Sequence, residues 1–167
     1  MRRFGLVSGA ACAIPDDTCV EKPDVMQQDD CIFCKIVRGE IPCAKVYETD
    51  QLLAFLDIAP VAPGHVLVIP KAHHVNLFDL PQDIGGRLFA ALSPLGEAIL
   101  ATTGATGLNV HMNNNSVAGQ VVFHAHLHLI PRSEGDGLGL WPGHPYPDAA
   151  AMEAVAEAVR KALPPGR

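Results

Sequence analysis

The chain has 167 residues, which fits one folded domain, and 49% of them are hydrophobic, which is enough for a core and excludes wholesale disorder. A net charge of −6 argues against a basic groove for nucleic acid, and an aromatic content of 5% argues against a stacking platform for single strands. No run of about 18 apolar residues occurs, so we expect no transmembrane helix and no membrane partner.

The first 30 residues show no sustained hydrophobic periodicity, and Pro15 and Pro23 interrupt them. Arg2-Arg3 and the apolar stretch that follows have the outline of a signal peptide, but this stretch is only weakly hydrophobic. We therefore favour a disordered leader over residues 1–30, a folded domain over residues 31–167, and a cytoplasmic location over export.

The first half of the folded region predicts a short helix followed by three strands. Asp29-Asp30 can cap a helix over residues 31–38, which Gly39 ends. A turn rich in proline precedes the third strand, which is rich in β-branched residues and therefore expected to be central. The strands are predicted at residues 45–48, 52–57 and 65–70, the first two as a hairpin.

The second half predicts two helices and two strands. Asp79 marks the start of a helix that runs to about Thr102, with a kink before Pro94, and Asp148 caps a last helix. Strands are predicted at residues 108–112 and 121–131. Because the strands outnumber the helices and the hairpins adjoin one another, the predicted class is α+β, with an antiparallel five-stranded sheet and two main helices.

Three histidines alternate with apolar residues in the last predicted strand. Because side chains alternate between the faces of a strand, His124, His126 and His128 would share one face at roughly 6.5–7 Å spacing. Two chemistries fit such a row: the imidazoles could chelate a catalytic metal, or one could act as a nucleophile that its neighbours assist. The opposite face is wholly apolar and should be buried; its members are Val121, Phe123, Ala125, Leu127 and Leu129.

The segment HAHLHLI over residues 124–130 resembles the signature of the HIT (histidine triad) family, in which three histidines alternate with apolar residues. Other segments are similar to the same family in the same order: CIFCKIVRGEIP (31–42), LAFLDIAPVAPGHVLVIPKAH (53–73), LFDL (77–80) and IPRSEGDGLGL (130–140). The resemblance covers about residues 31–163 and is closest to the bacterial, zinc-containing type of the Hint-like branch. It implies the HIT-like form of the α+β fold.

The resemblance implies a nucleotide hydrolase or transferase that acts on the α-phosphate of nucleoside 5′-phosphoramidates or dinucleoside polyphosphates. His126 matches the family's nucleophile, which forms a covalent nucleotidyl-histidine that water then hydrolyses to a nucleoside monophosphate. His128 would contact the phosphate or protonate the leaving group, and His65 matches the orienting histidine. Gln120 and Asn113 match contacts to the phosphate and the leaving group.

The resemblance also implies where a purine nucleotide binds. Asp57 would accept hydrogen bonds from the ribose hydroxyls, although an Asp before a turn is also common for structural reasons alone. Val121 stands where the family usually has Ser or Thr, so one hydroxyl contact to the phosphate is lost. An apolar slot for the base is matched by Ile32, Phe33, Ile36, Ile41, Phe55 and Ile58, and it does not indicate which base is preferred.

The five cysteines form no disulfide framework, because their number is odd and their spacing irregular. Cys31 and Cys34 lie one helical turn apart and can face one point, either as free thiols or as metal ligands. The resemblance implies a structural zinc held by Cys31, Cys34, His73 and His124, with His74 as a competitor for His73. We expect His111 and His144, which match no family position, to be surface residues.

The resemblance further implies a homodimer, paired through the helix after Asp79 and the strand at residues 108–112. That helix carries more large apolar residues than one sheet face should cover, and the strand would otherwise be an exposed edge. The residues concerned are Leu88, Phe89, Leu92, Leu95 and Leu100. The alternatives are a monomer covered by the last helix, a nucleotide-binding signalling module without catalysis, and a hydrolase with zinc on the three histidines.

Overall fold

The computed structural model describes residues 29–139 and 141–164. Nearly all of the predicted leader over residues 1–30 therefore lies outside the described residues. The chain divides into two compact units, one up to Glu134 and one from Gly135 onward, so the predicted domain over residues 31–167 spans both.

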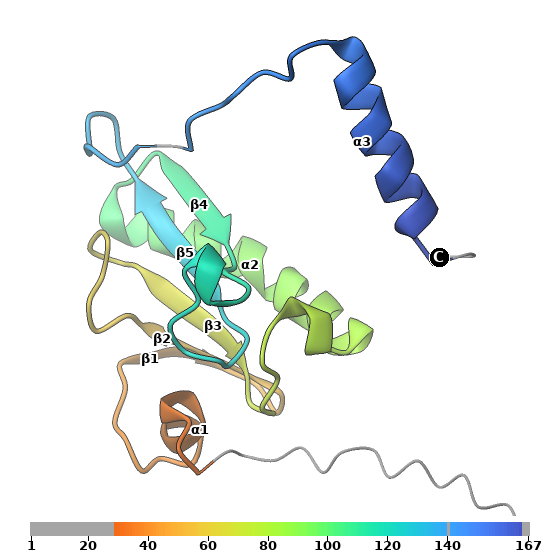
Figure 1. Cartoon of the computed structure of the whole chain (residues 1–167). Helices are drawn as coiled ribbons and strands as arrows, with labels where there is room; N and C mark the ends of the chain where they lie inside the picture. The colour runs from red at the N-terminus through yellow and green to blue at the C-terminus, as the bar shows by residue number, and fades with distance from the viewer. Residues whose placement is uncertain (1–28, 140, 165–167) are drawn as a thin grey trace, which may run out of the picture. The chain divides into compact units, whose positions relative to one another are not determined.

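The first unit is built on five antiparallel strands in the order β1-β2-β3-β5-β4, which confirms the predicted class (Figure 1). Both hairpin strands and the strand after the Pro-rich turn lie where the sequence places them, to within one residue at each end. The elements in chain order are α1 (Ile32–Val37), β1 (Lys45–Glu48), β2 (Leu52–Leu56), β3 (Val66–Pro70), a 3-10 turn η1 (Leu77–Asp79), α2 (Gln82–Thr103), β4 (Gly107–His111), a 3-10 turn η2 (Ser116–Ala118) and β5 (Leu127–Arg132).

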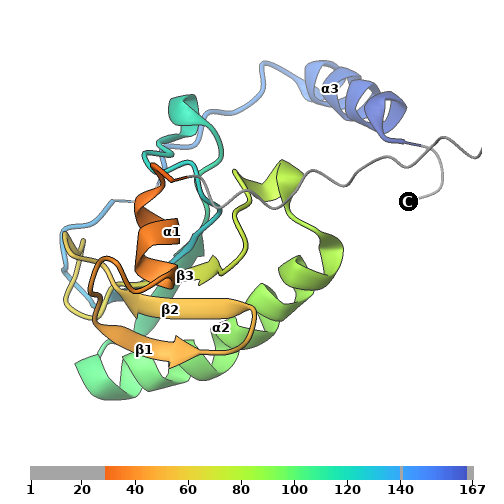
Figure 2. The ribbon, with the colours of Figure 1, turned by 90° about the horizontal axis from the view of Figure 1, so that it is seen from below.

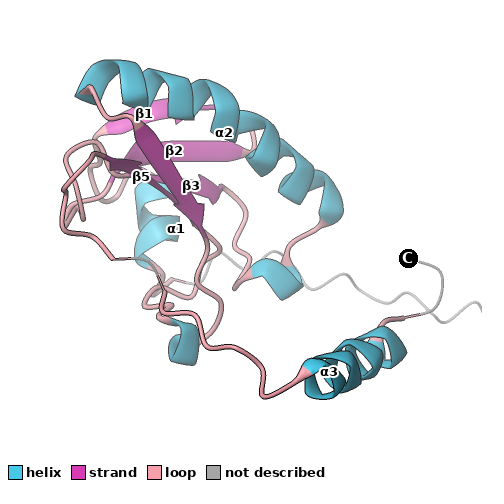
Figure 3. Cartoon of the chain, turned by 90° about the horizontal axis from the view of Figure 1, so that it is seen from above, coloured by secondary structure: helices cyan, strands magenta, loops and turns pink. Residues whose placement is uncertain are grey.

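The two helices of this unit cover opposite faces of the sheet (Figures 2 and 3). β2 and β3 are buried on both faces, so their sequences are continuous apolar runs rather than alternating ones. Leu52 and Val66 face α2, whereas Leu53 and Leu67 face α1. The sheet therefore separates a larger core under α2 from a smaller one under α1.

α2 is long and apolar enough to cross a membrane by length and composition, a test that the core helix of a soluble protein also passes. One face of it packs on the sheet, which accounts for its hydrophobicity. Its buried side chains recur every three or four residues: Ile84, Leu88, Ala91, Leu92, Leu95 and Ile99. The helix begins at Gln82 rather than at Asp79, because Asp79 ends η1 and the backbone of Leu80 and Pro81 is extended, with ψ of 123° and 145°. The helix then runs through Pro94.

The prediction of a strand over residues 121–131 is wrong for its first half. β5 begins at Leu127, and Val121 and Phe123, predicted to be buried, are 86% and 47% exposed. The register that pairs Val68 with Leu127 would place Pro70 opposite Ala125, and proline has no N–H with which to continue the ladder. Ala125 N–H instead donates to His74 O at 2.6 Å, in the loop after β3.

The surface proposed for dimerisation is less apolar than the sequence suggests. Leu88, Leu92 and Leu95 are buried against the chain's own sheet, so the expectation that one sheet face cannot cover them is wrong. Phe89 remains 74% exposed on α2. β4 is an edge strand, as predicted, because β5 is its only neighbour in the sheet of the described residues.

The second unit contains α3 (Ala149–Ala162), which the sequence predicts. The Asp148 carboxylate accepts a hydrogen bond from Ala151 N–H at 2.8 Å and so caps the helix as expected. Near its C-terminal end, Arg160 forms ion pairs with Glu153 and Glu157.

Gly64, directly before His65, provides a test of the turn that leads into β3. Its φ of +91° disfavours any other residue, and a Cβ there would lie 2.5 Å from Thr103 Cγ2. We expect Gly64→Ala to lower the free energy of unfolding by about 1–3 kcal/mol, measured by urea denaturation.

Gly86→Ala is the matched control, because a Cβ at this position of α2 meets no atom within 4 Å. We expect it to raise the free energy of unfolding by up to about 1 kcal/mol. Equal stability of Gly64→Ala and the wild type would show that the turn tolerates a side chain.

Candidate active site and metal centre

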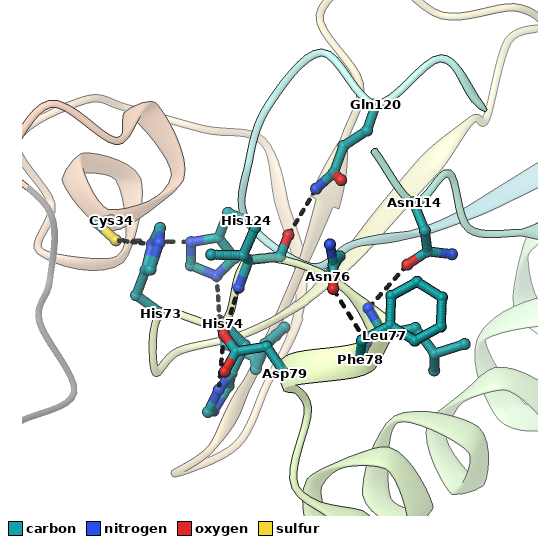
Figure 4. A network of polar contacts seen from close by, with 12 residues as sticks. Cys34, His73, His74, Asn76, Leu77, Phe78, Asp79, Asn114, Gln120 and His124 are labelled. Carbon is teal, nitrogen blue, oxygen red and sulfur yellow. Dashed lines mark hydrogen bonds and ion pairs between the residues drawn. The ribbon is translucent and has the colours of Figure 1, made fainter. Parts of the chain in front are cut away.

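Two cysteines and two histidines from three parts of the chain meet beside α1. Cys31 precedes α1 and Cys34 lies within it, His73 follows β3, and His124 precedes β5; Figure 4 shows Cys34 with the two histidines. Their four ligand atoms all lie within 4.8 Å of one another, so this group could hold a metal ion.

The distances in this cluster fit a tetrahedral ion. Cys31 Sγ lies 3.5 Å and Cys34 Sγ 3.6 Å from His124 Nδ1, and Cys34 Sγ lies 3.3 Å from His73 Nδ1. A zinc ion with bonds of about 2.3 Å to sulfur and about 2.0 Å to nitrogen holds such ligands about 3.5 Å apart. The donor set and its spacing therefore suit zinc.

His124 is in the protonation state that a metal ligand requires. It is fully buried, and burial lowers its pKa to about 4, so the ring is neutral at pH 7. Its Nε2–H donates to Pro70 O at 2.9 Å, which leaves the Nδ1 lone pair directed at the two sulfurs.

His74, the possible competitor for His73, does not join this group. Its Nδ1 lies 3.9 Å from Asp79 Oδ2, and its carbonyl binds Ala125 N–H (Figure 4). His74 therefore anchors the segment that carries the histidines rather than facing the cysteines.

His126 is held with one ring nitrogen available for chemistry. Its Nδ1–H donates to His124 O at 2.6 Å, so the lone pair of the neutral ring lies on Nε2. Burial lowers the pKa of His126, which keeps the ring neutral near pH 7. Phe33 packs against this ring in a T-shaped arrangement, with centroids 5.3 Å apart. His126 is thus arranged as a neutral nucleophile.

His128 lies next to it, at the end of a chain of hydrogen bonds. Val61 N–H donates to His65 Nδ1 at 3.3 Å, and His65 Nε2–H donates to His128 Nδ1 at 2.9 Å. The proton of His128 is therefore on Nε2, which is buried and has no hydrogen-bond partner in the described part of the chain. Burial, together with His126 and His65, lowers the pKa of His128 to about 4. His128 thus presents a proton donor without a partner.

Gln120 is buried and holds the loops around these histidines together. Its amide donates to Val75 O at 2.6 Å and to Val122 O at 3.1 Å, and its Oε1 accepts from Asn115 N–H at 2.8 Å. Both amide hydrogens are therefore engaged by backbone carbonyls, and a contact of Gln120 to phosphate would have to replace one of these bonds.

Asp57 and Asn113, the other polar residues predicted to bind substrate, are partly buried. Asp57 Oδ1 accepts from Ala59 N–H at 2.8 Å, which shapes the turn after β2, and its Oδ2 lies 3.5 Å from His65 Nδ1. Asn113 donates to Gly119 O at 3.3 Å. Asp57 therefore joins the histidine cluster.

The predicted apolar slot is only partly assembled. Phe33 and Phe55 pack edge to face with centroids 5.6 Å apart, and Ile36 packs against their cluster. Ile41 is partly buried, Ile32 is 46% exposed, and Ile58 is fully exposed.

The expectation that His111 is a surface residue is wrong. β4 pairs it directly with His128, and the two rings stack with centroids 5.1 Å apart and an angle of 29° between their planes. The sequence contains a usable signal, because antiparallel pairing of the last two predicted strands brings a histidine of one beside the triad of the other. His144, in contrast, is exposed as expected.

The three triad histidines do not converge on one point. His124 faces the cysteines, His126 binds a backbone carbonyl, and His128 binds His65. Among the described residues, no group that could hold a metal contains all three. The geometry therefore favours separate roles over a shared catalytic ion.

Comparison with known proteins agrees with this arrangement. Residues 38–135, more than half of the chain, match the model of the HIT domain. The chain belongs to the HIT family. A crystal structure of a HIT family member from Bacillus subtilis has a TM-score of 0.76 at 42% identity, covering 83% of this chain and all of that one. The bacterial, Hint-like branch fits these similarities.

Several relatives have names that state an activity. A Schizosaccharomyces pombe protein named adenosine 5′-monophosphoramidase is 46% identical over 69% of this chain and 85% of its own length. An Arabidopsis thaliana protein named adenylylsulfatase is 45% identical over 66% of this chain. The match spans only 56% of that plant protein.

Proposed function

We propose that the protein is an enzyme that hydrolyses nucleoside 5′-phosphate derivatives at the α-phosphate, through a nucleotidyl group carried on His126. The observation that carries this proposal is the hydrogen bond of 2.6 Å from His126 Nδ1–H to His124 O, because it leaves a neutral imidazole with its lone pair on Nε2. The adjacent unpartnered donor on His128 Nε2 supplies the second group that the reaction needs.

In the first step, the Nε2 lone pair of His126 attacks the α-phosphorus and the bond to the leaving group breaks. The leaving group takes that electron pair, accepts a hydrogen bond from the neutral His128 Nε2–H and receives its proton from a solvent water. The positive charge on the His126 ring is stabilised by His124 O. In the second step, water attacks phosphorus and gives up a proton to solvent, while the bond from phosphorus to His126 Nε2 breaks. Its electron pair returns to Nε2, and a nucleoside monophosphate is released.

The substrate class is a nucleoside 5′-phosphoramidate, with dinucleoside polyphosphates as further candidates. The names of the fungal and plant relatives support adenosine 5′-phosphate derivatives as substrates, with an amine or a sulfate bonded to the phosphate. Asp57 binds the ribose hydroxyls and Asn113 the phosphate side, whereas Phe33 and Phe55 offer an apolar surface for a purine base.

We propose that Cys31, Cys34, His73 and His124 hold one structural zinc ion. Four protein ligands leave no open position, so the ion's contribution is to link α1 to the segment that carries the nucleophile. Thiolate ligands require a reducing compartment, which agrees with a cytoplasmic location.

We expect His126→Ala to lower turnover of adenosine 5′-phosphoramidate by at least about 10³-fold while nucleotide binding survives, because only the bond-forming atom is removed. Release of AMP measures turnover, and calorimetry measures binding. His144→Ala, an exposed histidine elsewhere in the chain, serves as the control. Full activity of a folded His126→Ala protein would refute the mechanism, and binding without turnover by the wild type would favour a signalling module.

For the metal, we expect about one zinc per chain after purification without chelators. Replacing both Cys31 and Cys34 by Ser should lower zinc content and melting temperature together, since binding of a structural ion is coupled to folding. Cys43→Ser is the matched control, a cysteine that packs against the α1 core outside the cluster. Wild-type protein without zinc by elemental analysis would contradict the assignment.

We also propose a homodimer, in which the edge strand β4 and the exposed Phe89 on α2 form a self-complementary surface. Sedimentation velocity at micromolar concentration should give a single species of twice the monomer mass. Phe89→Asp should shift it toward the monomer, whereas Phe78→Asp, at an exposed phenylalanine outside both elements, should not. A wild-type species at 17.7 kDa would refute the dimer.

A further inference from the structure

The imidazole of His111 packs on the ring of His128 although the proposed mechanism gives it no role. Antiparallel pairing of β4 with β5 places the two residues directly opposite each other. Their rings are stacked, with centroids 5.1 Å apart and planes inclined by 29°. His111 is partly buried, and burial lowers its pKa, so the packing is between two neutral rings near pH 7.

His128 has a histidine on each side. β5 lies between β3 and β4, so its side chains have neighbours on both strands. His65, directly before β3, contributes the hydrogen bond of 2.9 Å to His128 Nδ1, with the ring centroids 5.1 Å apart. His111 reaches the same ring from β4, on the other side.

The bond to His65 alone does not determine where His128 Nε2–H points. A ring held through one nitrogen can still pivot about that bond, and the opposite nitrogen then moves most. No hydrogen bond within the described residues restrains this nitrogen. A hydrogen bond from this N–H stabilises the leaving group only when the two lie within hydrogen-bond reach, and a misplacement of about 1 Å can cost about 10²-fold in rate.

We propose that His111 is a positioning residue, whose ring packs on His128 and fixes the direction of its Nε2–H toward the leaving group. This inference rests on the function proposed above for His128. His111 acts by shape and contact, so any side chain that presents a similar flat or bulky apolar surface at this position of β4 preserves the effect.

The test compares His111→Ala with His111→Phe. We expect His111→Ala to lower kcat by about 10- to 100-fold with KM within about twofold, and His111→Phe to restore kcat to within about threefold of the wild type. Val110→Ala is the matched control, because Val110 is the adjacent β4 residue, pairs with Leu129 and faces the other side of the sheet. Its kcat should be unchanged.

A purely structural role for His111 would instead lower the melting temperature of His111→Ala well below that of Val110→Ala and leave kcat unchanged. That result overturns the proposal. Loss of kcat in His111→Phe as large as in His111→Ala also overturns it, since the ring nitrogens and not the packing would then be responsible.

A second measurement does not depend on turnover. Nitrogen-15 spectra of the histidine rings should show the same Nε2–H tautomer for His128 in all three proteins, because His65 sets it, but signals broadened by ring motion in His111→Ala only. Unchanged line widths of His128 in His111→Ala contradict the positioning role. If the broadening is found but the wild type hydrolyses no nucleotide, the proposed function fails while the packing of His128 by His111 stands.

Discussion

The site depends on the three contacts that one buried residue makes. The Nδ1 of His124 faces the cysteine pair, its Nε2–H donates to the carbonyl at the end of β3, and its own carbonyl accepts the Nδ1–H of His126. The cysteine cluster and His126, the proposed nucleophile, are thus joined through a single residue. A displacement of His124 would move its Nδ1 away from the cysteines and also remove the hydrogen bond that fixes the tautomer of His126.

Burial is the physical means by which this site keeps its histidines neutral. Desolvation is the largest cause of the lowered pKa of His124, His126 and His128, which suits both a metal ligand and a nucleophile. Neutral buried rings still need hydrogen-bond partners, and backbone carbonyls supply them for two of the three. The sheet makes this possible, because its central strands β2 and β3 are buried on both faces and Phe33 of α1 packs against the rings of His124 and His126.

Local patterns in the sequence predict most of the scaffold. The hairpin, the continuous apolar strand after it, the long amphipathic helix and the Asp148 cap all follow from spacing and turn chemistry over a few residues. Spacing alone pointed to Cys31 and Cys34, and the resemblance to the HIT family implied His73 and His124 as their partners; the structure brings all four together. The length of the histidine strand could not be predicted, because the β3–β5 register decides it: continued beyond Val68, that register would bring Pro70 opposite Ala125.

The sequence by itself determined the fold class, the residue types at the site and their order along the chain, because hydrophobic period and motif spacing are local properties. Only the tertiary structure decided which atoms face each other. The tautomer of His126 is set by the carbonyl of His124, which lies outside the strands, and that of His128 by His65, which lies beside β3. His111 joins the site because the β4–β5 register places it opposite His128. Likewise, Gln120 binds backbone groups of its own loop between β4 and β5 and of the loop after β3, 45 residues away in sequence. Such pairings arise when strands and loops distant in sequence come into register, and no local pattern contains that information.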